Sequence, residues 1–152
     1  MAQSLLAQAP AAQSGVTKFT SSGIPVLFKP VTANDVIAVR LYLKGGSANL
    51  TAKMAGIERL IGETSTRGTQ KYPKEVFDAR SVTTGSTIGA AATYDYSVYT
   101  LQAVRQHWDE AWDLLAETVT HPTFPAAELE LVRERVLNEQ RQHEDNADAH
   151  LD

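Results

Sequence analysis

The sequence Gly56-Ile-Glu-Arg-Leu-Ile-Gly-Glu-Thr-Ser-Thr-Arg-Gly-Thr69 predicts a short helix between two glycine positions. Ile57, Leu60 and Ile61 recur at the spacing of one helix face, so we expect them to form its apolar stripe. Gly68 follows where a left-handed residue commonly ends a helix. The stretch therefore predicts a helix that packs on the rest of the chain through three aliphatic side chains.

Runs rich in β-branched and alternating apolar residues lie on both sides of this helix. Five runs are predicted to be strands: 16–20, 24–29, 35–44, 85–93 and 97–104. The first two are separated by Ser21-Ser22-Gly23, which is typical of a hairpin turn. In the third, every second residue from Ile37 to Leu43 is apolar, which predicts a strand half buried by helices.

Three more helices are predicted, at 73–81, at 106–120 and from Pro125 onward. Trp108 and Trp112 are four residues apart, and we expect both to pack in the core rather than to form a ligand platform. The last helix carries Leu129, Val132 and Val136 on one stripe. The fold class expected from these elements is α+β, a mostly antiparallel sheet with helices packed on one face.

Composition narrows the classes of function. The chain has 152 residues, enough for one domain with a core. A net charge of −4 without any basic cluster argues against nucleic-acid binding. No apolar run approaches the length of a membrane span, so no membrane partner is expected.

The N-terminal segment Met1–Ser14 is predicted to be a disordered tail or the remnant of a signal peptide, because Ala7-Gln8-Ala9 matches an Ala-x-Ala pattern. Residues 15–152 are expected to form one partial domain. The chain has no cysteine, which fits a bacterial periplasmic protein and excludes disulfides and thiolate metal sites.

Six short motifs occur in an order and spacing that resemble the first domain of the pitrilysin-like (M16) zinc peptidases. They are Ser22-Gly23-Ile24-Pro25-Val26, Gly45-Gly46-Ser47, Thr66-Arg67-Gly68-Thr69, Thr93-Tyr94-Asp95-Tyr96-Ser97-Val98-Tyr99, His121-Pro122-Thr123-Phe124-Pro125 and Glu134-Arg135-Val136-Leu137-Asn138-Glu139. No single motif is specific to the family. Their common order carries the resemblance.

The family motif Gly-Leu-x-His-x-x-Glu-His is degenerate in this chain. Alignment on Arg67-Gly68-Thr69 places the two histidines and the general-base glutamate on Arg59, Glu63 and Gly62. The resemblance implies a third ligand at Glu139, 76 residues after Glu63. A catalytic zinc needs three protein ligands and an open water position, so we expect no catalytic residues and no bound metal here. Arg59 is expected to pair with one of the carboxylates, unless these side chains are simply solvated or retain weak metal binding.

The resemblance also implies a substrate site and a partner. Gly89-Ala90-Ala91-Ala92-Thr93 falls where the family's edge strand pairs with an extended peptide, although an ordinary strand inside the sheet is the alternative. The expected function is a non-catalytic subunit that holds peptide beside a homologous zinc-bearing peptidase chain, with the zinc in that partner. The alternatives are a structural or assembly protein of the same fold, or a chain belonging to a zinc-dependent metalloendopeptidase.

Self-association is expected as well. The stripe Leu129, Val132 and Val136 is predicted to lie exposed, together with unpaired strand edges. Such surfaces are commonly covered by another copy of the chain.

Overall fold

The computed structural model describes residues 15–145, and their side chains as far as residue 142. The chain divides into two compact units, Met1–Asn34 and Asp35–Asp152. The predicted tail, Met1–Ser14, lies outside the described residues. No helix in the described part of the chain has the length and apolar character of a membrane-spanning segment.

The first unit is a β-hairpin. Strand β1 (Thr17–Ser21) pairs antiparallel with β2 (Ile24–Phe28), and Ser21 faces Ile24 across the turn. Ser22 and Gly23 both have positive φ, 49° and 83°. This backbone twist matches that of the two strands, which explains why a glycine occupies the second turn position. The predicted hairpin is confirmed.

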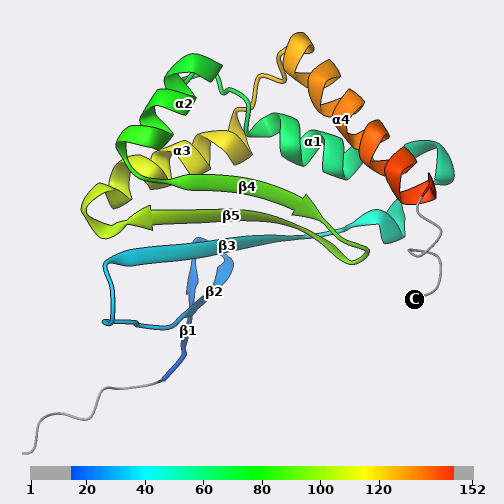
Figure 1. The fold of residues 1–152 in the computed structure, drawn as a ribbon. Helices are drawn as coiled ribbons and strands as arrows, with labels where there is room; N and C mark the ends of the chain where they lie inside the picture. Colours follow the sequence, from blue (N-terminus) through cyan, green and yellow to red (C-terminus); the bar gives the residue numbers. More distant parts are fainter. Residues whose placement is uncertain (1–14, 146–152) are drawn as a thin grey trace, which may run out of the picture. The chain divides into compact units, whose positions relative to one another are not determined.

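The second unit contains a three-stranded antiparallel sheet. Its strands are β3 (Val36–Lys44), β4 (Thr87–Ala92) and β5 (Tyr96–Val104), in the order β3-β5-β4. Its helices are α1 (Ile57–Ser65), α2 (Lys74–Thr83), α3 (Trp108–Thr120) and α4 (Ala126–Asp145). Short 3-10 turns occur at Ser47–Asn49, Ala52–Met54 and Arg105–His107. All four helices lie on one side of the sheet, as the α+β prediction requires (Figure 1).

The core lies between β5 and α3. Tyr99, Leu101 and Ala103 of β5 pack against Ala111 and Leu115 of α3. A second cluster joins Leu114 to the buried rings of Tyr72 and Phe77. Because β5 is the central strand and α3 lies over it, the inward-facing side chains of both elements leave water almost completely.

The predicted burial of Trp112 is wrong. Its side chain is 46% exposed, whereas Leu114 is completely buried. The buried positions of α3 are Ala111, Leu114, Leu115 and Thr118, and this spacing turns position 112 away from the sheet. Trp112 stacks on Trp108 instead, with ring centroids 5.4 Å apart.

The predicted apolar stripe of α1 is not its buried face. Thr64 and Ser65 are completely buried, and Ile61 is 44% exposed. A Cβ placed on Gly62 would lie 3.1 Å from the Cβ of Ala90, so α1 packs against β4 too closely for large side chains. Small and hydroxyl-bearing residues therefore form the interface that we expected to be aliphatic.

The end of α1 also differs from the prediction. The helix ends at Ser65, and the Thr66 hydroxyl donates to the Glu63 carbonyl oxygen at 2.8 Å. Gly68 is not the cap: its φ is 147°, and its carbonyl oxygen accepts a hydrogen bond from the Thr123 amide at 3.1 Å. It joins the segment after α1 to the segment before α4.

The prediction that the α4 stripe is exposed is also wrong. Val132 is completely buried, and Leu129 and Val136 are half-buried. The reason is that α4 packs against α1, which covers this face (Figure 1). Leu131 and Leu137 are large apolar side chains that α4 does expose.

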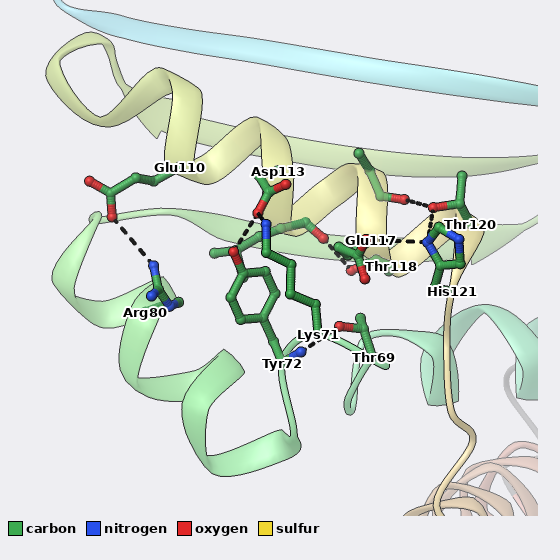
Figure 2. A network of polar contacts seen from close by, with 12 residues as sticks. Thr69, Lys71, Tyr72, Arg80, Glu110, Asp113, Glu117, Thr118, Thr120 and His121 are labelled. Atoms are coloured by element: carbon green, nitrogen blue, oxygen red, sulfur yellow. Dashed lines mark hydrogen bonds and ion pairs between the residues drawn. The ribbon is translucent and has the colours of Figure 1, made fainter.

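Polar contacts fasten the loop after α1 to α3 (Figure 2). The Lys71 ammonium donates to Asp113 Oδ2 at 2.7 Å, and the Tyr72 hydroxyl donates to the same oxygen. The hydrogen bond from Lys71, followed by that from Tyr72, holds the pKa of Asp113 below its usual value. The Tyr72 amide donates to Thr69 Oγ1 at 3.0 Å, which fixes the loop that carries the Arg67-Gly68-Thr69 motif.

Candidate functional site

Three of the predicted site positions lie on α1. The helix begins after Gly56, whose φ of 82° and ψ of −6° are left-handed, and the chain turns there into the first helical residue. Arg59 and Glu63 are four residues apart and therefore lie on the same side of the helix. Gly62 faces β4, where its missing side chain allows the close contact with Ala90.

Helix α4 brings two more charged side chains to this place. Arg59 Nε donates to Glu63 Oε1 at 2.7 Å, and the same guanidinium donates to Glu139. The other carboxylate oxygen of Glu63 accepts a hydrogen bond from Arg135. Arg59, Glu63, Arg135 and Glu139 form one set of contacts, here called the ion-pair cluster, which links α1 to α4.

The ion-pair cluster contains two guanidinium groups and two carboxylates, so its formal charge is zero. The hydrogen bond from Arg59 holds the pKa of Glu139 below its usual value. The hydrogen bonds to Glu63 and then to Glu139 raise the pKa of Arg59. Because the Arg59 and Glu139 side chains are each about two-fifths exposed, solvent screens their attraction and the pair contributes little to stability.

The side chains at the family's zinc positions do not fit a zinc ion. The Arg59 guanidinium lies between Glu63 and Glu139, so a cationic side chain fills the space between the two carboxylates. Zinc sites are built from neutral imidazole, thiolate and carboxylate donors, and a guanidinium cannot act as a ligand. Within the described residues, no group of three or more His, Cys, Asp or Glu side chains lies close enough to hold a metal ion.

The structure thus brings Arg59, Glu63 and Glu139 together, although 76 residues separate the last two along the chain. The expected pairing of Arg59 with a carboxylate is found with both acids. Arg135 was missed by the sequence interpretation. Its signal was its spacing, because Arg135 is four residues before Glu139, just as Arg59 is four residues before Glu63.

The predicted peptide site lies at an edge of the sheet. Strand β4 pairs with β5 alone among the described residues. Gly89 to Ala92 belong to this strand, but Thr93 lies beyond its end and caps the turn, where its hydroxyl donates to the Tyr96 carbonyl oxygen at 2.9 Å. The small side chains of Gly89 to Ala92 leave the backbone of β4 accessible.

The orientation of the β4 amides follows from the ladder. The Thr93 amide donates to the Tyr96 carbonyl oxygen at 2.8 Å, which marks these opposed residues as a hydrogen-bonded pair. Along an antiparallel ladder, hydrogen-bonded pairs alternate with pairs whose backbone groups point away from the partner strand. The register then directs the backbone groups of Gly89 and Ala91 toward β5, and those of Ala90 and Ala92 toward the open edge.

Comparison with known proteins places these features in a family. The model of the insulinase family, peptidase family M16, matches residues 26–152. The chain belongs to this family. The predicted resemblance is confirmed, and the ion-pair cluster of this M16 chain lies where the resemblance implies zinc ligands.

Two similar proteins have curated names. An uncharacterised zinc protease of Bacillus subtilis, YmxG, is 26% identical over 128 residues, which cover 84% of this chain and 31% of the relative. The mitochondrial-processing peptidase subunit beta of Dictyostelium discoideum is 25% identical over 126 residues, which cover 81% of this chain and 27% of the relative. The M16 chain therefore spans about a third or less of the length of these relatives.

Solved structures show the same fold. A protease from Helicobacter pylori matches 91% of this chain and 34% of its own, with a TM-score of 0.76 and 22% identity. A peptidase M16 inactive domain from Pseudomonas fluorescens matches 87% of this chain and 32% of its own, with a TM-score of 0.78 and 23% identity. At this identity the comparison establishes the fold alone.

Proposed function

We propose that this M16 chain is a non-catalytic subunit that holds an extended peptide while a homologous zinc-bearing chain cleaves it. The ion-pair cluster is the observation that carries the proposal. Two arginines and two glutamates neutralise one another at the place where a zinc peptidase needs a metal and a general base. Gly62, at the general-base position, has no side chain with which to accept a proton.

The names of two similar proteins are compatible with this role. One solved relative is described as an inactive domain of an M16 peptidase, and one curated relative is a subunit of a processing peptidase. We infer from these names that M16 chains occur both without activity and as parts of larger assemblies. The zinc-bearing homologue is the partner that the proposal requires.

The open edge of β4 supports the peptide-holding part. An extended peptide can add to such an edge through main-chain hydrogen bonds, which depend little on its sequence. Ala90 and Ala92 direct their backbone groups outward, and their small side chains do not block the approach. A subunit that presents many different peptides needs this kind of contact.

Restoring the zinc positions tests the non-catalytic assignment. The chain as it stands is expected to retain no stoichiometric zinc after dialysis against a weak chelator. In the triple variant Arg59→His, Gly62→Glu, Glu63→His, Arg135 still lies beside the site and repels the ion. We therefore expect tight zinc binding only when Arg135→Leu is added, with Glu139 as the third protein ligand.

The control is the same quadruple variant with Glu139→Gln, which should lose most of the affinity for zinc. Stoichiometric zinc in the unmodified chain would contradict the proposal. For the holding role, the zinc-bearing homologue is assayed with and without this chain. An equal rate of peptide cleavage in the two assays would favour the structural alternative.

A further inference from the structure

A small cavity lies between α1 and the helix-covered face of the sheet. Its volume is about 120 Å³, and its apolar wall is formed by Leu43, Ile61, Ala90 and Tyr99. Leu43 and Ile61 are 41% and 44% exposed, so the cavity is reached from solvent at these two side chains. At ~30 Å³ per water molecule, the volume corresponds to about four waters.

The cavity exists because three facing residues are small. Gly62 of α1 lies opposite Ala90 of β4, and Ser97 of β5 completes the wall. A larger residue at position 62 would project toward the sheet at this point. Gly62 occupies the family's general-base position and has no side chain. The cavity therefore stays open and is large enough for a side chain of another molecule.

The polar group of the cavity is Glu58. Its Oε2 accepts a hydrogen bond from the Ser97 hydroxyl at 3.2 Å. In the described part of the chain, no cation lies within ion-pair distance of this carboxylate, although Arg59, the next residue, is paired twice. A half-buried carboxylate without a cationic partner beside an apolar wall is complementary to a cation on an aliphatic stem.

We propose that this cavity, the Glu58 pocket, binds a lysine or arginine side chain of the peptide held along β4. The aliphatic stem contacts Leu43, Ile61 and Tyr99, and the cationic end pairs with Glu58. Ala90 and Ala91 of β4 form part of the same wall, so a peptide at this edge can place a side chain in the pocket. The inference rests on the proposed function for its peptide, but the pocket can be tested without one.

The first experiment uses two small probes on the whole chain. Nα-acetyl-lysine methylamide carries the proposed cation, and Nα-acetyl-norleucine methylamide has the same four-carbon stem without it. We expect the lysine probe to produce saturable shifts of the Gly62, Ala90 and Ser97 amide signals in ¹⁵N–¹H spectra. The norleucine probe should bind at least fivefold more weakly.

Matched variants test whether the preference for lysine depends on Glu58 or on any acidic residue in the first turn of a helix. Glu58→Gln should abolish the preference for lysine, whereas Glu75→Gln, which changes the first-turn acid of α2, should retain it. Equal binding of the two probes, absence of binding, or a preference that survives Glu58→Gln would each overturn the pocket. Peptide binding is then measured separately. Peptides that bind without a preference for lysine would refute only the Glu58 pocket. Failure of all peptides to bind would refute the proposed function.

Discussion

Leu114 and Trp112 are two residues apart on α3 and have opposite surroundings. Leu114 is completely buried against Tyr72 and Phe77, whereas nearly half of Trp112 remains in water. Size and hydrophobicity alone favour the tryptophan as the core residue. The rotation of about 100° per residue in a helix decides otherwise, because it directs position 114 toward the Tyr72 and Phe77 rings and position 112 toward solvent.

The stability of α3 variants tests this difference. Leu114→Ala should lower the free energy of unfolding by about 2–5 kcal/mol, since it leaves a cavity in a packed cluster. Trp112→Leu retains an apolar side chain and loses chiefly the contact with the Trp108 ring. This variant should lower the free energy of unfolding by about 0.5–1.5 kcal/mol. Urea unfolding of both variants measures the difference. A larger loss for Trp112→Leu would show that the assigned helix face is wrong.

The ion-pair cluster makes a second prediction about a single residue. The pKa of Glu139 is lowered in the folded chain by its hydrogen bond to Arg59. The contribution of this pair is therefore complete above the usual glutamate pKa of about 4.3, and it is lost as the pH falls through the lowered folded value. Arg59 stays charged throughout this range.

A carboxyl-carbon NMR titration checks this expectation. The Glu139 midpoint should lie below about 4.3 in the unmodified chain and return toward that value in Arg59→Gln. Arg133→Gln is the matched control, because Arg133 pairs with Glu130 instead. Identical Glu139 midpoints in the unmodified chain and in Arg59→Gln would show that Arg59 and Glu139 are not paired in solution.

At the scale of elements, β4 has one hydrogen-bonded side and one open side. One side pairs with β5, and no strand among residues 15–145 pairs with the other. The alternation of the ladder assigns Ala91 to the paired side and Ala92 to the open side. A proline at Ala91 therefore breaks an internal hydrogen bond, and a test of the open edge requires Ala92.

Ala92→Pro should leave the fold intact and weaken peptide binding by roughly 3- to 10-fold, the effect of one lost hydrogen bond of about 1 kcal/mol. Ala92→Ser keeps the amide and should bind as the unmodified chain does. Ala91→Pro should instead destabilise the domain by at least about 1 kcal/mol. Fluorescence anisotropy with a labelled extended peptide measures the binding. Unchanged affinity in folded Ala92→Pro would exclude this edge as the peptide site.

At the scale of the whole molecule, the sheet face of the second unit that lies opposite the helices exposes several large apolar side chains. Val36, Tyr42, Tyr96 and Val104 alternate with inward-facing residues on β3 and β5, and each is more than a third exposed. Tyr42 and Tyr96 contact each other edge to face, with ring centroids 5.1 Å apart. This face replaces the α4 stripe as the reason to expect self-association.

Sedimentation equilibrium at micromolar concentration should detect a dimer or larger species. Tyr42→Lys together with Val104→Lys should shift the equilibrium toward monomer, because a buried lysine without a partner is unfavourable in an interface. Val82→Lys, at an 82% exposed position on α2, is the matched control and should have no effect. A monomer across the whole concentration range would refute self-association.

The sequence by itself determined the elements and the family. Hydrophobic periodicity and turn residues predicted the hairpin, the three strands of the larger sheet and the four helices, because these depend on neighbours within a few positions. The order of short motifs predicted the family, and the missing histidines predicted a site that does not resemble a zinc centre. Arg59, Glu63 and Glu139 were named on that basis.

Only the tertiary structure decided which faces are buried and how the charges combine. The face of α1 that packs on the sheet presents Gly62 to Ala90 and Ser65 to Tyr99 rather than aliphatic residues, because periodicity in the sequence does not encode how closely two elements approach. Val132 is buried since α4 packs on α1. The structure also revealed the partners of Arg135 and Glu58. A side chain's partners depend on segments that are distant in the chain, and folding alone brings those segments together.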